Sequence, residues 1–253
     1  MSARFEGKVA LITGGGTNIG RRTAAAFAAA GATVVVAGRR EEILAETAKD
    51  IRNAGGAADY VVADVTKSAD VSHLVSEVVQ RHGGLHIAFN NAGTVGKPAP
   101  TAELEEDVWA SVFAVNTTGI WLSMKYEIAH MREHGGGVIV NCASNIGFHG
   151  RRPGMSAYAA SKAAVSVLTR NAAREYIGSG IRINSVSPGG TDTPMSYRSG
   201  EDQAARDARV RDAVPIGRVA ETREIADSVL WLASDESSFV VGHDLVVDGG
   251  ATA

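Results

Sequence analysis

Short apolar runs alternate with longer helix-forming segments along the first 90 residues of this chain. The apolar runs have the length of buried strands and lie at 8–13, 33–37, 57–63 and 86–89. The segments between them have helical composition and lie at 21–30, 41–53 and 68–82. Because strands separated by helices pair in parallel, this order predicts an α/β fold, a single Rossmann-like, doubly wound parallel sheet of about seven strands with helices on both faces.

The second part of the chain continues the pattern. Further strands are expected at 138–141, 182–187 and 244–247, and helices at about 103–132, 157–176 and 221–233. Residues 195–213 are polar and charged, so we expect a helical excursion outside the sheet and a candidate substrate lid at about 194–215. No linker, repeat or low-complexity tract divides the sequence, which predicts one domain over residues 1–253.

The charge balance and cysteine content exclude several classes of partner. A net charge of −3 provides no broad basic surface, so nucleic acid and membranes are not expected partners, and a small molecule is. The sequence also has no apolar run of membrane-spanning length and no signal-peptide pattern at its start. The single cysteine, Cys142, cannot form an intramolecular disulfide, which favours a cytoplasmic location. The seven histidines show no metal-ligand spacing, so no metal site is predicted.

A glycine-rich turn follows the first predicted strand. It runs from Thr13 to Gly20 and contains Gly14, Thr17, Asn18 and Ile19. Backbone N–H groups and the dipole of the following helix favour a pyrophosphate at such a turn. The spacing departs from the general dinucleotide pattern G-x-G-x-x-G, whose last position falls on Ile19. A purely structural glycine-rich turn is therefore the alternative interpretation.

The end of the second predicted strand indicates which cofactor is used. It reads Ala37-Gly38-Arg39-Arg40, without the carboxylate that would accept a hydrogen bond from a ribose 2′-hydroxyl. Arg39 can instead form a bidentate contact with a 2′-phosphate, so NADP(H) is favoured and NAD(H) is the alternative. Glu41 and Glu42 follow directly, and a merely solvated helix start would explain the arginines equally well.

Tyr158 and Lys162 are four residues apart in a helix-forming stretch, which brings their side chains together on one helix face. A phenol has an ordinary pKa near ~10, and a neighbouring cation lowers that pKa toward neutrality. The pair is therefore a candidate acid/base device, although an isolated pair of this spacing is more often an exposed surface feature.

Two further polar residues lie where a site is expected. Asn116 shares the apolar stripe of its predicted helix, so its amide should point inward, either bonded to nearby backbone or holding a water or Lys162 in a relay. Ser144 follows the strand 138–141 at its carboxyl end, where open α/β sheets bind ligands.

Taken together, these motifs resemble the short-chain dehydrogenase/reductase family over residues 8–250. They occur in the family's order and are joined by Asn90-Asn91-Ala92-Gly93, Pro188-Gly189 and Val247-Asp248-Gly249-Gly250. The resemblance implies that Asn116, Ser144, Tyr158 and Lys162 are catalytic, and that Tyr158 and Lys162 also contact the cofactor. It further implies that Asp64 and Val65 bracket the adenine, that Asn91, Ala92 and Gly93 lie along the adenosine and its ribose, and that Thr191 and Thr193 approach the nicotinamide amide and the phosphates.

Three features depart from the family pattern. Asn18 replaces the middle glycine of the turn, but asparagine tolerates positive φ better than most residues. Thr17 stands where NADP-preferring relatives often carry a basic residue. The segment from Ser144 to Tyr158 is about one residue longer than in many relatives.

The family resemblance predicts an NADP(H)-dependent oxidoreductase that interconverts a ketone and a secondary alcohol with tyrosine as the acid/base, and it predicts a homotetramer. A 3-oxoacyl-carrier-protein reductase is an alternative; it would need a basic docking patch, to which Arg132, Arg151, Arg152 and Arg174 are candidate contributors. A non-catalytic NAD(P)-binding regulator or scaffold is the alternative of a different class. Phe148, Met155, Met195 and Tyr197 are expected either to form apolar pocket walls or to pack the lid.

Overall fold

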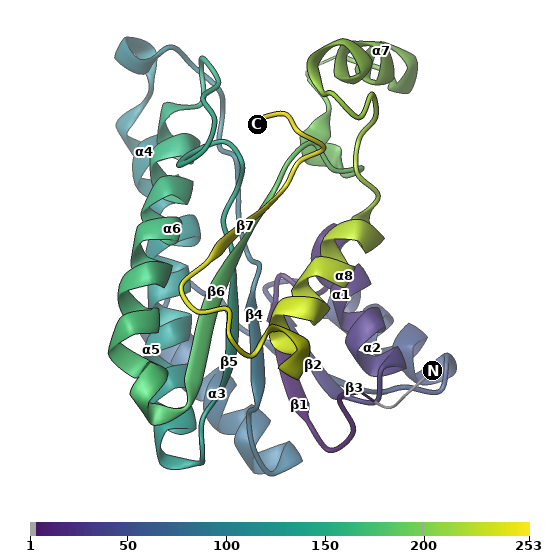
Figure 1. Ribbon diagram of the computed structural model, residues 1–253, viewed down its shortest axis with the longest axis vertical. Coiled ribbons are helices and arrows are strands. Elements are labelled where there is room, and N and C mark those ends of the chain that lie inside the picture. Colours follow the sequence, from purple (N-terminus) through teal and green to yellow (C-terminus); the bar gives the residue numbers. More distant parts are fainter. Residues whose placement is uncertain (1–3, 199) are drawn as a thin grey trace.

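Seven parallel strands form one sheet in the computed structural model, which describes residues 4–198 and 200–253. The order across the sheet is β3-β2-β1-β4-β5-β6-β7 (Figure 1). The strands are β1 (Val9–Thr13), β2 (Thr33–Gly38), β3 (Ala57–Val62), β4 (Ile87–Asn90), β5 (Gly137–Cys142), β6 (Ile181–Pro188) and β7 (Asp244–Val247). The strand order reverses between β1 and β4, and open α/β sheets bind their ligands at this switch point. The predicted doubly wound sheet is confirmed.

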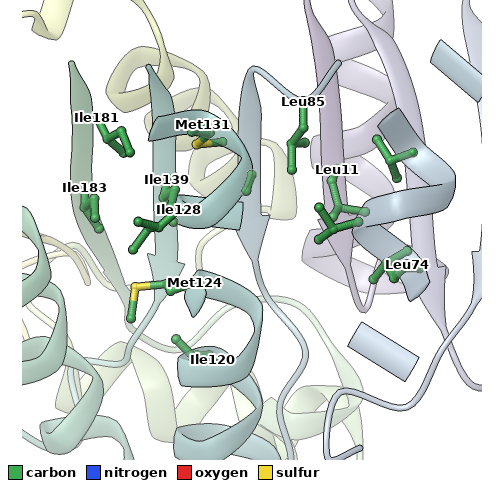
Figure 2. Packing of buried hydrophobic residues seen from close by; sticks show 14 of the residues in the cluster. Leu11, Leu74, Leu85, Ile120, Met124, Ile128, Met131, Ile139, Ile181 and Ile183 are labelled. Atoms are coloured by element: carbon green, nitrogen blue, oxygen red, sulfur yellow. The ribbon is translucent and has the colours of Figure 1, made fainter. Parts of the chain in front are cut away.

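Helices cover both faces of the sheet. α1 (Asn18–Ala29), α2 (Glu41–Asn53) and α8 (Thr222–Ala233) pack on one face, and α3 (Ser68–His82), α4 (Glu106–Phe113), α5 (Gly119–Glu133) and α6 (Ser156–Tyr176) lie on the other (Figure 1). Successive strand residues point to opposite faces, so Leu11 packs under α3 and α5 whereas Ile12 packs under α1 and α8. Figure 2 shows the first of these cores, in which Leu11 and Leu74 lie on one side and Met124, Ile139 and Ile183 on the other.

The helix expected at 103–132 is interrupted in the structure. A short 3₁₀ turn, η1 (Thr101–Glu103), precedes α4, and a π-helical segment, η2 (Ala114–Thr118), separates α4 from α5. A π segment inserts an extra residue into the turn and shifts the facing of the helix at that point. Asn116 lies in η2 and is completely buried, so the interruption directs its amide inward.

The polar segment at 194–215 lies beyond the carboxyl ends of the strands. It contains the 3₁₀ turn η4 (Pro194–Ser196) and α7 (Gln203–Ala213), which stands away from the sheet (Figure 1). The Asp202 carboxylate accepts a hydrogen bond from the Ala205 N–H at 2.8 Å and caps the helix start. Arg206 is buried, and it pairs with Asp192 at 2.5 Å and with Asp207 at 2.8 Å. The pair with Asp192 fastens α7 to the loop that follows β6, whereas the pair with Asp207 lies within the helix.

Two further 3₁₀ turns, η3 (Ile177–Ser179) and η5 (Asp235–Ser237), follow α6 and α8. Within the described residues, no helix combines the length and the apolar character needed to cross a bilayer.

Candidate active site

A cavity of about 520 Å³ opens at the carboxyl ends of the central strands. Most of the predicted site residues line it, although they come from the segments that follow four different strands and from helix α6. The predicted residues that line it are Gly14, Thr17, Asn18, Ile19, Asn91, Ala92, Gly93, Ser144, Tyr158, Lys162, Pro188, Gly189, Thr191 and Thr193. The strand order thus brings the glycine-rich turn and the Tyr158–Lys162 pair to one cavity, as expected for a switch-point site.

The glycine-rich turn is held tightly by main-chain contacts. Gly14 has φ +64°, and Asn18 has φ +48°, which confirms that asparagine occupies a left-handed position here. A Cβ atom on Gly20 would lie 2.2 Å from the Gly14 carbonyl oxygen, so only glycine fits at this crossing. The Asn91 amide donates to the Thr13 and Gly14 carbonyls at 3.2 Å and ties the turn to the loop after β4. Gly20 thus shapes the turn without itself lining the cavity.

Tyr158, Ser144 and Lys162 form a polar group in the cavity wall. Ser144 follows β5, whereas Tyr158 and Lys162 lie one turn apart on α6. The buried Lys162 Nζ donates to the Cys142 carbonyl at 2.6 Å and lies 6.0 Å from the centre of the Tyr158 ring. Burial lowers the pKa of the Lys162 ammonium. One cavity therefore brings together two hydroxyl groups and an amine.

The expected lowering of the Tyr158 pKa by Lys162 is not seen in the chain's own structure. Burial instead raises the pKa of Tyr158 to about 12, and the hydrogen bond with Ser144 offsets only part of that rise. Since the ammonium of Lys162 is directed at the Cys142 carbonyl, its charge does not dominate at the phenol. The sequence spacing predicted that the two side chains would lie close together. It did not predict that burial would affect the pKa of Tyr158 more than Lys162 does.

Asn116 lies behind the cavity wall. Its Oδ1 accepts from the Thr94 N–H at 2.8 Å, and its Nδ2 donates to the Thr94 carbonyl at 2.8 Å and to Ser161 Oγ at 3.0 Å. A Cβ atom on Gly93 would lie 3.4 Å from Asn116 Oδ1 and 3.5 Å from Lys162 Nζ, so both side chains flank this glycine. Asn116 thus bonds to nearby backbone, as one of its two interpretations expects, while Lys162 lies on the other side of Gly93.

Arg39, Asp64 and Val65 lie outside the cavity lining. Arg39 is exposed after β2, beside the loop after β3, because Gly38 pairs with Val62. Burial acts to raise the pKa of Asp64, but hydrogen bonds from Thr66 and the charges of Arg39 and Lys67 hold it below its ordinary value. Val65 is buried and packs against the backbone of Gly119. Arg39 and Asp64 thus lie near each other at the ends of β2 and β3, outside the cavity lining.

The arginines proposed for carrier-protein docking do not form one patch. Arg151 and Arg152 line the cavity, whereas Arg132 and Arg174 lie near the ends of α5 and α6 that precede β5 and β6. In a parallel sheet those helix ends lie at the edge opposite the cavity. Of the four candidate contributors to a docking patch, only Arg151 and Arg152 therefore lie at the cavity.

The four residues expected either to form apolar cavity walls or to pack the lid divide between different places. Met155 and Met195 line the cavity, but Phe148 and Tyr197 do not. Phe148 is exposed and stacks with Arg170 at 4.4 Å, and Tyr197 lies under Arg206 at 4.5 Å.

Sequence analysis missed a buried carboxylate that supports the loop between Ser144 and Tyr158. Asp244, at the start of β7, accepts from Ser166 Oγ at 2.6 Å and Ser187 Oγ at 2.7 Å, and its Oδ2 lies 2.9 Å from His149 Nε2. Those bonds overcome burial and keep the pKa of Asp244 below its ordinary value. The sequence did contain an indication of this carboxylate, because Asp244 stands at the start of an otherwise apolar predicted strand.

The strand order, the glycine turn at β1 and the hydroxyl–amine group at β5 and α6 define a nucleotide-dependent oxidoreductase of the Rossmann type. Residues 15–252 match the family model described as enoyl-(acyl carrier protein) reductase. The chain belongs to the short-chain dehydrogenase/reductase family, is an oxidoreductase, and uses an NAD(P) cofactor.

Named relatives match along the whole chain. Cyclohexanol dehydrogenase of Acinetobacter sp. (strain SE19) is 41% identical over 100% of this chain and 98% of the relative. Cis-4-hydroxycyclohexanecarboxylate dehydrogenase of Sinomonas cyclohexanicum is 40% identical over 100% of both chains. Among solved structures, levodione reductase superimposes with a TM-score of 0.94 at 35% identity, over 98% of this chain and 99% of that chain.

Proposed function

We propose that this enzyme interconverts a small cyclic ketone and its secondary alcohol with NADP(H), and that Tyr158 is the acid and base. The observation that carries the proposal is the single cavity lined by both the glycine-rich turn and the Ser144–Tyr158–Lys162 group. The names of the relatives, two of which are dehydrogenases of hydroxylated cyclohexanes, support a cyclic alcohol as the substrate.

The residues present fit such a cofactor. Gly14 and Gly93 line the cavity without side chains, and a Cβ atom at Gly93 would meet Lys162 Nζ at 3.5 Å. When bound, the reduced nicotinamide supplies a hydride to the carbonyl carbon. Asn91, Ala92, Thr191 and Thr193 line the same cavity and provide polar groups for the rest of the cofactor.

The protein's own groups handle the substrate oxygen and the proton. Ser144 and Tyr158 hydroxyls would hold the carbonyl oxygen, and Tyr158 would donate its proton to that oxygen as the alcohol forms. In the reverse direction the tyrosinate accepts the proton. Lys162 would favour the tyrosinate by its charge if it turned from the Cys142 carbonyl toward the phenol, and this would act against the burial that raises the pKa of Tyr158 to about 12.

The test is Tyr158→Phe, which removes the hydroxyl and keeps the ring. NADPH affinity, measured by fluorescence titration, should stay close to that of the wild type, while turnover of cyclohexanone should fall by at least the ~10²-fold that general acid catalysis contributes. Turnover within a few-fold of the wild type would refute the role of Tyr158.

The choice of NADP(H) over NAD(H) depends on Arg39. Its exposed guanidinium lies beside the loop of Asp64, at the expected place of a ribose 2′-phosphate. Arg39→Ala should raise KM for NADPH by about tenfold, the value of one charge-assisted contact, and leave KM for NADH nearly unchanged. Lys49→Gln, an exposed change on α2, is the matched control. Equal effects on both cofactors would contradict the preference.

The proposal extends to the lid, the assembly and the location. Residues 194–215 would close over the substrate, since Met195, Val210 and Val214 already line the cavity.

A homotetramer would cover the half-exposed Trp109 and Trp121 and the fully exposed Phe239. Light scattering on the purified protein tests this assembly. A cytoplasmic location agrees with the one free, buried cysteine.

A further inference from the structure

Cationic side chains crowd the cavity wall. Five of them line it, namely Arg151, Arg152, Lys162, Arg198 and Arg209, and no Asp or Glu among the described residues does. A cavity lined by one sign of charge attracts ligands of the opposite sign. The pyrophosphate expected at the glycine-rich turn lies on the β1 side, whereas Arg152 belongs to the loop between Ser144 and Tyr158 on the reacting side.

Three of these cations already have partners within the protein. Lys162 donates to the Cys142 carbonyl, and Arg151 donates to the carbonyls of Gly147, Phe148 and Gly150. Arg209 forms two hydrogen bonds of 2.7 Å with the Glu201 carboxylate. Their positive groups are therefore held in place by the fold.

The guanidinium groups of Arg152 and Arg198 differ from the other three. Neither forms a hydrogen bond or an ion pair with any residue that the structure describes. Burial, together with the charges of Arg198 and Arg209, lowers the pKa of Arg152, while Glu201 acts in the opposite direction. The Arg152 side chain is exposed, but it lies among like charges, and an incoming anion would relieve that repulsion.

Apolar side chains line the same cavity as the cationic ones. Ile146, Met155 and Met195 line the same space as Arg152. A ligand that suits this lining has an apolar body and one compact anionic group, and a guanidinium binds a carboxylate through two parallel hydrogen bonds.

We propose that Arg152, assisted by Arg198, binds a carboxylate on the substrate at the end remote from the reacting carbonyl, so that the enzyme's substrates are cyclic oxo acids and hydroxy acids. The assignment of the reaction rests on the proposed function above, but carboxylate binding does not.

The first measurement is independent of turnover. Calorimetric titration of the enzyme with NADP+ present would compare cyclohexanecarboxylate with cyclohexanecarboxamide, which has a similar shape and no charge. The carboxylate should bind about ten- to a hundredfold more tightly, the range for a charge-assisted pair. In Arg152→Gln this advantage should shrink to about threefold or less, whereas the exposed Arg132→Gln, near the opposite edge of the sheet, should keep it.

The second measurement compares kcat/KM for 4-oxocyclohexanecarboxylate and 4-oxocyclohexanecarboxamide in the same three proteins. The ratio of kcat/KM for the carboxylate to kcat/KM for the carboxamide should change among the three proteins in parallel with the ratio of the two ligands' affinities. Equal binding of both ligands by the wild type, or an unchanged ratio in Arg152→Gln, overturns the carboxylate site. Weaker NADPH binding in Arg152→Gln with an unchanged ligand ratio also overturns it, because Arg152 would then serve the cofactor. Tight carboxylate binding without reduction of either ketone supports the site and refutes the proposed function instead.

Discussion

Glu127 makes the stability of this fold depend on pH in an unusual direction. The side chain is completely buried on α5, where its Oε2 accepts from Asn90 Nδ2 at 2.9 Å. Asn90 Nδ2 also donates to Asn141 Oδ1 at 3.1 Å, and Asn141 donates to Thr169 at 2.9 Å. The other carboxylate oxygen, Oε1, has no hydrogen-bond partner among the described residues. Burial raises the pKa of Glu127 from 4.5 to about 7.

The sign of the effect follows from comparing the folded and unfolded chains. Below pH 4.5 the carboxyl is protonated in both states, and its full contribution to stability is present. As the pH rises toward 7, the unfolded chain ionises first, so the free energy of unfolding falls. The difference between the two pKa values corresponds to a loss of about 3 kcal/mol at pH 8. For a chain of this size, that loss lowers Tm by roughly 6–12 °C.

Glu127→Gln tests the reasoning, since glutamine keeps an oxygen for Asn90 and carries no charge. Thermal unfolding followed by circular dichroism at equal protein concentration should show similar Tm values at pH 5. At pH 8 the variant should melt several degrees above the wild type. Glu133→Gln, an exposed change on the same helix, is the control and should follow the wild type at both values. A constant Tm difference across this range, or a less stable variant at pH 8, would refute the argument.

Three other substitutions test separate features. Asn18→Val should destabilise the protein by about 1–2 kcal/mol because of the positive φ, whereas Asn18→Gly should not; Tm values check this. Gly20→Ala should cost about 1–3 kcal/mol because the added methyl meets main chain, whereas Gly178→Ala, which has open space, should be nearly neutral in the same melts. Arg206→Met should remove both ion pairs of α7 and speed amide hydrogen exchange over 203–213; unchanged exchange would contradict the anchoring role.

The sheet was predictable because its strands are short, apolar and separated by helices with clear ends. Parallel pairing and a position at the carboxyl ends of the strands then follow from topology alone. The break at 114–118 was not predictable, since the low helix propensity of Val115, Asn116 and the two threonines does not distinguish a π-helical segment from a weak stretch of α-helix. Contacts with Thr94 and Ser161, distant in sequence, fix Asn116 there.

The sequence predicted which residues would meet at the candidate site, but it did not predict their pKa values. Motif order indicated which loops meet, and the structure places Ser144, Tyr158 and Lys162 together. The spacing could not show that burial outweighs the lysine at the phenol, because desolvation depends on residues throughout the fold. Glu127 was overlooked although it lies on the same helix face as Met124 and Met131, where an acidic residue is a signal of a buried polar network.

The strand order has a consequence for enzyme redesign. Arg39 and Asp64 belong to the β2 and β3 side of the sheet, whereas the reacting groups belong to β5 and α6, on the far side of β1 and β4. Exchanging residues at the first location to change which nicotinamide nucleotide is accepted should therefore leave the second intact. Given the role proposed for Arg39, a library randomised only at positions 39 and 40 should yield variants that differ in coenzyme preference and keep the groups on β5 and α6 unchanged.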